Sequence, residues 1–313
     1  MCLLDANFCE ACGVNLDAAL APPKEPCVSC EALAVEVTDD GWCQICGTKQ
    51  PSPEDHVVAD HGWFSVVSDR GRVHRTNEDA GAVAARPTGV ALVVCDGVSS
   101  TDDSQHAAQA AVKTIINRLQ AAPDGRADQA IVKAAALARD AIIEVTPEQS
   151  TEPPSCTMVA AVVEMSGDTA SIELGWLGDS RAYWLSGTEA QQLTRDHSWA
   201  DEQAELGELE QDAIDADPRA HSITRWLGAD SPDVTPELLT SEVPLPGTLL
   251  LCSDGLWNYA PTDNEMFTAV HAGPEDESPL ARAERLVAFA NEKGGHDNIT
   301  VALAYLTTTT TDR

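Results

Sequence analysis

The sequence has 313 residues, with 51 Asp and Glu against 19 Lys and Arg, so its formal net charge is −32. A chain this acidic is poorly suited to binding a nucleic-acid backbone or an anionic membrane surface, and we exclude both as partners. No apolar run approaches the ~18 residues of a membrane span, and the first residues lack the features of a signal peptide, so we predict a cytoplasmic protein.

Seven of the ten cysteines lie within the first 46 residues, mostly as Cys-x-x-Cys pairs. Two of these pairs are separated by twelve residues, which is typical of four thiolates around one structural zinc ion. The predicted ligands are Cys27, Cys30, Cys43 and Cys46. Since all four ligands are thiolates, no coordination position is left open for catalysis.

A third pair, Cys9 and Cys12, resembles half of another zinc site whose first half is missing, because Cys2 is the only thiol before it. A water, a histidine or another chain could complete it, or the given start could lie inside a longer ribbon, and the sequence leaves these alternatives open. We assign residues 1–50 to a zinc-ribbon module with a short strand at 33–37. Residues 51–61, which contain Pro51 and Pro53, are predicted to be a linker.

From residue 62 onward, apolar runs and helical spacing predict a mixture of strands and helices. The predicted strands cover 63–67, 81–85, 90–95, 156–164, 169–177, 181–185, 234–243, 248–253 and 299–304. The predicted helices cover 105–120, 129–145, 262–272 and 279–292, and the acidic segment 199–222 has a helical bias. Runs of strands and runs of helices, without strict alternation, indicate an α+β sandwich with antiparallel sheets and helices outside. Residues 307–313 are expected to be a tail.

Acidic residues stand at the ends of several predicted strands. Asp96 and Asp254 each end an apolar run and precede glycine, Asp179 follows a third strand, and Asp297 precedes the last one. Each could be only a turn residue on its own. Together, carboxylates without nearby His or Cys ligands suit Mg²⁺ or Mn²⁺, and cations would neutralise acids that cannot be buried unpaired. Gly97 would let its backbone carbonyl approach a metal closely.

Seven short motifs occur in one order along this domain. They are Asn77-Glu78-Asp79-Ala80, Val94-Cys95-Asp96-Gly97, Gly178-Asp179-Ser180-Arg181, Thr194-Arg195-Asp196-His197, Ile223-Thr224-Arg225, Ser253-Asp254-Gly255 and His296-Asp297-Asn298-Ile299-Thr300-Val301. In this order they resemble the metal-dependent protein serine/threonine phosphatases, the protein phosphatase 2C-like family of bacterial type. The resemblance covers residues 62–306, which we assign to one phosphatase domain.

The resemblance implies a four-layer α-β-β-α sandwich of two antiparallel sheets, preceded here by the small zinc ribbon. It also implies that a water bridging two Mg²⁺ or Mn²⁺ ions hydrolyses phosphoserine and phosphothreonine in proteins. Asp96 would bridge both ions, Asp254 and Asp297 would complete the first, and the Gly97 carbonyl with Glu78 and Asp79 would hold the second. Asp179, with Asp254, would match a third, weaker site, and residues 198–222 would form a flap. Phosphoprotein substrates and an opposing serine/threonine kinase pathway are the implied partners.

One position departs from the resemblance. The family places a phosphate-binding arginine five residues before the acid matched by Asp79, and this sequence has His74 there, with Arg75 one residue later. Either His74 or Arg75 could bind the phosphate. The departure also leaves an alternative function, a pseudo-phosphatase or adaptor that binds phosphoproteins or partners through the zinc ribbon.

Overall fold

The computed structural model describes residues 25–38, 41–101, 103–207, 209–220 and 222–308. The chain divides between Ser52 and Pro53 into two compact units, which are described separately. In the part of the chain that is described, no helix combines the length and the apolar character needed to cross a membrane.

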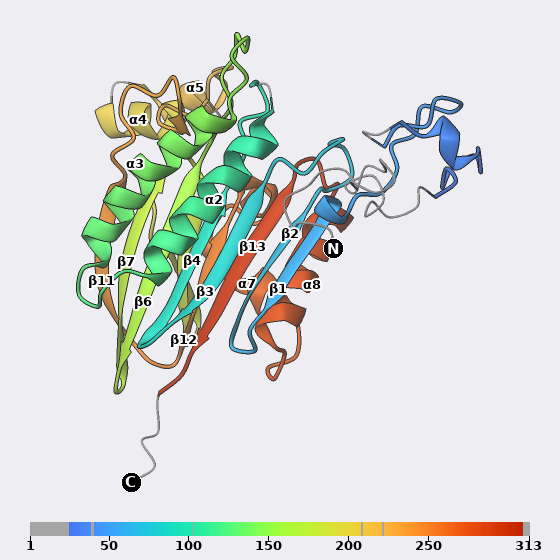
Figure 1. The fold of residues 1–313 in the computed structure, drawn as a ribbon. Helices are drawn as coiled ribbons and strands as arrows, with labels where there is room; N and C mark the ends of the chain where they lie inside the picture. The colour runs from blue at the N-terminus through green and yellow to red at the C-terminus, as the bar shows by residue number, and fades with distance from the viewer. Residues whose placement is uncertain (1–24, 39–40, 102, 208, 221, 309–313) are drawn as a thin grey trace, which may run out of the picture. The chain divides into compact units, whose positions relative to one another are not determined.

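The larger unit contains two antiparallel sheets (Figure 1). The six-stranded sheet has the order β1-β2-β13-β12-β8-β9, the five-stranded sheet has the order β11-β7-β6-β4-β3, and β5 pairs with β10. The strands are β1 (His56–Asp60), β2 (Phe64–Asp69), β3 (Ala80–Arg86), β4 (Gly89–Cys95), β5 (Ser155–Cys156), β6 (Met158–Ser166), β7 (Thr169–Leu177), β8 (Arg181–Ser186), β9 (Glu189–Gln192), β10 (Leu227–Gly228), β11 (Glu237–Pro244), β12 (Gly247–Cys252) and β13 (Ile299–Leu306).

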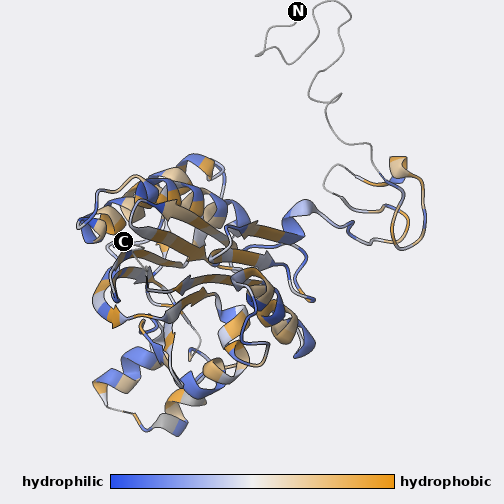
Figure 2. Cartoon of the chain, turned by 90° about the horizontal axis from the view of Figure 1, so that it is seen from below, coloured by the Kyte–Doolittle hydropathy of each residue, from blue (hydrophilic) through white to orange (hydrophobic). Residues whose placement is uncertain are grey.

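Helices cover the outer faces of both sheets. The helices are α2 (Ser104–Gln120), α3 (Ala127–Val145), α4 (Trp199–Leu206), α5 (Gln211–Asp215), α6 (Asp254–Trp257), α7 (Asp263–Val270) and α8 (Pro279–Glu292), with short 3₁₀ turns η1 (Ala34–Glu36) and η2 (Pro53–Asp55). Helices α2 and α3 cover the five-stranded sheet, while α7 and α8 lie against the other sheet (Figure 1). The apolar colouring of the strands, sandwiched between helices, shows the same layers in Figure 2.

Strand β4 is buried on both faces, which explains its unbroken apolar sequence. Side chains alternate along a strand, so Ala91 and Val93 pack against α2 and α3, while Val90 and Leu92 fill the core between the two sheets. Burial on both sides fixes the register, because a shift by one residue would exchange the two sets. The residue that follows β4, Asp96, is thereby held at a defined position at the end of the sheet.

The α+β sandwich of two antiparallel sheets flanked by helices is confirmed. Three local predictions differ from the structure. Residues 33–37 were expected to be a strand, but η1 occupies their centre. The predicted linker 51–61 is wrong at His56–Asp60, which form β1 and pair along their whole length with β2. Strand β9 was not predicted, because Glu189–Gln192 is short and polar and gains its structure from pairing with β8.

Candidate active site

The four strand-end aspartates predicted from the sequence lie around one pocket of about 380 Å³. Asp96 follows β4, Asp179 follows β7, Asp254 begins α6 after β12, and Asp297 precedes β13. Gly97, Thr157 and Ile223 are among the other residues that line it. Ser222 and Ile223 also line the pocket. They follow α4 and α5, so the predicted flap segment ends at this pocket.

Asp96 is held by the backbone of a neighbouring segment. Its N–H donates to Oγ1 of Thr157 at 3.0 Å, and its carbonyl accepts the Thr157 N–H at 2.7 Å. The next residue, Gly97, donates its N–H to the Glu78 carbonyl at 3.2 Å. A Cβ atom on Gly97 would lie 2.7 Å from that carbonyl oxygen, so only glycine fits this close approach.

Two buried carboxylate oxygens have no hydrogen-bond partner within the described residues. They are Oδ1 of Asp79 and Oδ1 of Asp254. The second oxygen of Asp79 accepts a hydrogen bond from the Ser253 hydroxyl at 2.7 Å, and that of Asp254 accepts one from Asn258 Nδ2 at 3.2 Å. Since an unpartnered buried acceptor is costly, these oxygens are suited to a ligand that the protein itself does not supply.

Burial and mutual repulsion disfavour the charged forms of several carboxylates at the pocket. Burial raises the pKa of Asp79 to about 7, that of Asp254 to about 7 and that of Asp179 to about 8. It also raises the pKa of Asp96 well above its ordinary value. Repulsion from neighbouring carboxylates acts in the same direction in each case. Cations would relieve both effects, so the donor set fits hard divalent ions.

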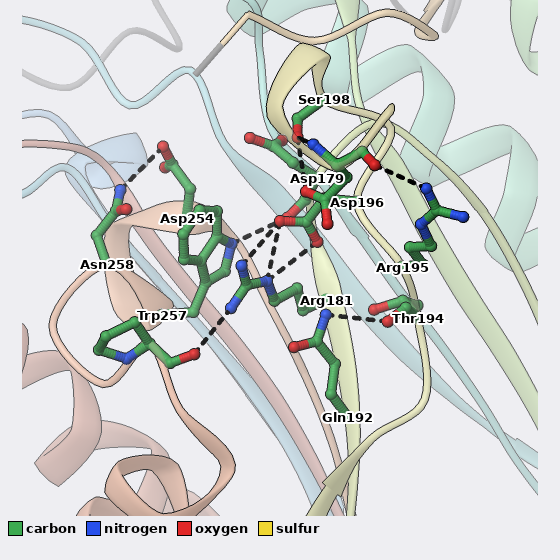
Figure 3. A network of polar contacts seen from close by, with 12 residues as sticks. Asp179, Arg181, Gln192, Thr194, Arg195, Asp196, Ser198, Asp254, Trp257 and Asn258 are labelled. Atoms are coloured by element: carbon green, nitrogen blue, oxygen red, sulfur yellow. Dashed lines mark hydrogen bonds and ion pairs between the residues drawn. The ribbon is translucent and has the colours of Figure 1, made fainter. Parts of the chain in front are cut away.

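A polar network positions Asp179, as Figure 3 shows. Trp257, at the end of α6, donates its indole N–H to the Asp179 carbonyl at 2.9 Å. The guanidinium of Arg181 lies 3.7 Å from the Trp257 ring centroid and forms a two-pronged ion pair with Asp196, its shortest contact being 2.8 Å. Because α6 begins at Asp254, Trp257 connects the turns that carry two of the pocket carboxylates.

The sequence did not identify Trp257 or Ser253 as site residues. The available signal was their place directly beside Asp254: Ser253 precedes it, and Trp257 lies one helical turn after it. Asn298 was also missed, although it binds three residues of the segment 70–78. It accepts the Glu78 N–H at 2.7 Å and donates to the carbonyls of Arg70 and Thr76.

Glu78 and His74 lie at the edge of the pocket. The Glu78 carboxylate accepts a hydrogen bond at 2.9 Å from the hydroxyl of Ser99, a pocket residue. His74 Nε2 lies 3.3 Å from Asp297 Oδ1, while Arg75 is exposed. His74 is therefore in direct contact with a carboxylate of the pocket.

The smaller unit brings four thiols together. Their sulfur atoms lie within 4.8 Å of one another and belong to Cys27, Cys30, Cys43 and Cys46. Two of the sulfur pairs are 3.5 and 3.7 Å apart, close to the ~3.8 Å between ligands of a tetrahedral zinc ion with Zn–S bonds of about 2.3 Å. This cluster can hold a structural zinc ion. The less certain ligands Cys9 and Cys12 lie outside the described residues.

Comparison with known proteins gives consistent matches to the larger unit. The family model described as protein phosphatase 2C matches residues 70–291. The serine/threonine phosphatase stp of Listeria welshimeri is 30% identical over 244 residues, covering 75% of this chain and 92% of that protein. The crystal structure of the Mycobacterium tuberculosis serine/threonine phosphatase PstP/Ppp superposes with a TM-score of 0.66 at 27% identity, covering 80% of this chain and 99% of that one. A further structure, the catalytic domain of PstP in complex with two manganese ions, has a TM-score of 0.62 at 26% identity, with 80% and 99% coverage.

Proposed function

The chain belongs to the protein phosphatase 2C family and is a protein serine/threonine phosphatase, and we propose that the aspartates around its pocket hold the metal ions of this reaction. Two manganese ions occupy a related catalytic domain of similar fold, which supports metal-dependent dephosphorylation by this chain. The observation that carries the assignment is the pocket itself, where four strand-end acids meet and burial raises the pKa of three of them, Asp96, Asp179 and Asp254.

The residues fit a pair of Mn²⁺ or Mg²⁺ ions. Asp96 would bridge the two ions, Asp254 and Asp297 would complete one site, and the Gly97 carbonyl with Glu78 and Asp79 would hold the other. Asp179 would serve a third, weaker site together with Asp254. The unpartnered oxygens of Asp79 and Asp254 support this distribution, because each is buried with an unused acceptor.

The acids are spread around the walls of the pocket. Among the described residues, the ligand atoms of the carboxylates are not as tightly grouped as the four sulfur atoms of the zinc cluster, and a pocket of about 380 Å³ separates them. Two bound divalent ions supply an activated water and positive charge for the phosphoryl oxygens. The chain contributes the position of each carboxylate, through Thr157 for Asp96, Ser253 for Asp79 and Asn258 for Asp254.

We assign phosphate binding to His74 rather than Arg75. Asp297 lies 3.3 Å from His74 Nε2, so this imidazole reaches the pocket and can donate a hydrogen bond to a phosphoryl oxygen beside the metal ligands. The Arg70 guanidinium donates a hydrogen bond to the His74 carbonyl, which holds the backbone at this position.

Removal and return of metal tests the proposed function. We expect the purified chain to hydrolyse p-nitrophenyl phosphate and a phosphothreonine peptide with Mn²⁺, to lose this activity in EDTA, and to regain it when excess Mn²⁺ is added. Turnover is measured as released nitrophenolate and inorganic phosphate. Undiminished activity in EDTA would contradict a metal-dependent reaction. Metal binding without any turnover would favour the adaptor alternative.

Substitution of the two candidate phosphate ligands separates their roles. We expect His74→Ala to raise KM for phosphopeptides about tenfold, because a hydrogen bond to the charged phosphate, worth about 1.5 kcal/mol, is lost. Arg75→Ala should change KM less than twofold. Steady-state kinetics at saturating Mn²⁺ measure both values. The opposite ranking of the two variants would move the phosphate ligand to Arg75.

The substrates are phosphoproteins, and we propose that a serine/threonine kinase pathway in the same compartment supplies them. We further propose a cytoplasmic location. None of the seven cysteines that the structure describes is in a disulfide, and cysteines without disulfides are typical of a reducing compartment. For the smaller unit we propose a docking role for a zinc-bound ribbon, with residues 1–52 as one module and the phosphatase domain ending near residue 306.

A further inference from the structure

An arginine-rich segment, residues 70–75, contacts the acidic pocket through His74. Three of the chain's 19 Lys and Arg residues, together with His74, fall within the six residues 70–75. His74, near the end of this segment, touches Asp297. This concentration of arginine lies next to a pocket carboxylate in a protein whose net charge is −32.

The backbone of this segment is fixed against the segment that carries Asp297. Asn298 Nδ2 donates to the Arg70 carbonyl at 2.7 Å and to the Thr76 carbonyl at 3.0 Å, and the Arg72 N–H donates to the Gly295 carbonyl at 2.8 Å. Gly71 has φ of +71°, and a Cβ there would lie 2.1 Å from the Asp297 carbonyl oxygen. These contacts hold the cationic segment at the rim of the pocket.

The acids beside this segment are already engaged by other groups. Asp55 pairs with Arg70 at 3.4 Å, and Asp69 is bound by His56 at 2.7 Å and by Asn291 at 3.0 Å. The Arg72 residue is exposed, and within the described part of the chain it makes no ion pair. The charge of its guanidinium is therefore left for a group outside the protein.

We propose that Arg72 selects phosphoprotein substrates that carry an Asp or Glu close in sequence to the phosphorylated residue. The proposal rests on the phosphatase function and on phosphate binding beside His74. Arg72 lies two residues before His74, and the Cα atoms of residues i and i+2 are at most about 7 Å apart, so the two backbones are within two residues' length of an extended peptide. An acidic side chain one to three residues from the phosphate can reach the guanidinium and replace water as its partner.

The expected preference is modest, because an exposed ion pair contributes little in water. It corresponds to about a two- to fivefold difference in kcat/KM between matched substrates. The effect should weaken in 0.5 M salt, where exposed charges are screened over a few ångströms. A contact based on shape or apolar packing would not share this salt dependence.

Two phosphothreonine peptides test the proposal, identical except for Asp or Lys at the two positions on each side of the phosphothreonine. With full-length protein, Mn²⁺ and low salt, we expect kcat/KM to favour the Asp peptide two- to fivefold, and Arg72→Glu to reverse the preference. Lys133→Glu, on the exposed face of α3, makes the same change in net charge and should leave the preference as in the wild type.

The outcomes separate this inference from the function on which it rests. Equal kcat/KM for the two peptides, or an unchanged preference in Arg72→Glu, would overturn the role of Arg72 while leaving the phosphatase function in place. A reversal by Lys133→Glu as well would assign the preference to net charge instead of to this loop. Failure to hydrolyse both peptides and p-nitrophenyl phosphate would overturn the phosphatase assignment and this inference with it.

Discussion

Replacement of Asp254 by Asn is expected to reduce phosphatase turnover by about a thousandfold or more, equivalent to roughly 4 kcal/mol of activation free energy. Asp254 begins α6 at the pocket, its Oδ1 is buried without a partner, and it is the proposed ligand of two metal sites. An amide keeps the shape of the side chain but provides no negative charge for a cation. The measurement is kcat with p-nitrophenyl phosphate over a range of Mn²⁺ concentrations.

Asp168→Asn provides the matched control, because Asp168 is an exposed residue of the turn between β6 and β7. It should retain wild-type kcat and the wild-type dependence on Mn²⁺. Full activity in Asp254→Asn would show that this carboxylate does not take part in the reaction. A loss of activity shared by Asp168→Asn would indicate a general effect of removing acidic charge.

The Asp254→Asn variant also allows loss of catalysis to be distinguished from loss of folding. The folded-state pKa of Asp254 is raised to about 7, above its ordinary value of 3.8, so the metal-free native state binds more protons than the unfolded state between these pH values. Stability of the metal-free wild type therefore falls as pH rises from about 4 to 7. Over this rise in pH, the free energy of unfolding of Asp254→Asn should fall by on the order of 2 kcal/mol less than that of the wild type. Urea unfolding at pH 8 in EDTA measures the difference. A variant that unfolds more easily than wild type at pH 8 would contradict this.

Replacement of Cys27 by Ser is expected to release the bound zinc ion and unfold residues 25–50, with little effect on hydrolysis of p-nitrophenyl phosphate. Structural zinc contributes about 10–16 kcal/mol to the folding of such small modules. The described core of this module is only Cys27, Val37 and Cys43, with Ala32 packed beside them, which is too small to fold on apolar burial alone. Native mass spectrometry of the full chain measures the zinc content, and limited proteolysis reports on the fold.

Val28→Ser is the matched control within the same Cys-x-x-Cys turn, since Val28 is exposed and its neighbouring thiols are unchanged. It should keep one zinc ion. A wild-type protein without zinc would contradict the zinc ribbon. A second zinc ion in the wild type would indicate that Cys9 and Cys12 also find ligands. Loss of catalysis in Cys27→Ser would show that the two units depend on one another.

Much of the fold follows from local pattern. The strands buried on both faces, such as β4 and β6, have long apolar sequences, and α2 and α3 show apolar and alanine residues at helical spacing. The errors lie where tertiary pairing decides the structure. Strand β1 begins with His56, lies beside a proline-rich stretch and has mostly exposed side chains, so only its ladder with β2 makes it a strand.

The candidate site was predicted in part for a similar reason. Aspartates at strand ends leave a signal in the sequence, because an apolar run stops at a single acid. The residues that orient them leave none, since Ser253 and Trp257 act through partners far away in the chain. Ser253, for example, binds Asp79 and accepts the N–H of Thr300, and nothing in the local sequence indicates either contact.

The position of β13 has a consequence for partly cleaved or partly synthesised chains. This strand follows every other described helix and strand in the sequence, yet it lies inside the six-stranded sheet, between β2 and β12. A chain that stops before Asp297 would lack one carboxylate of the pocket and would expose the edges of both neighbouring strands to other chains. Such fragments would be inactive and prone to aggregate. Phosphatase activity would therefore come only from chains in which β13 has taken its place in the sheet.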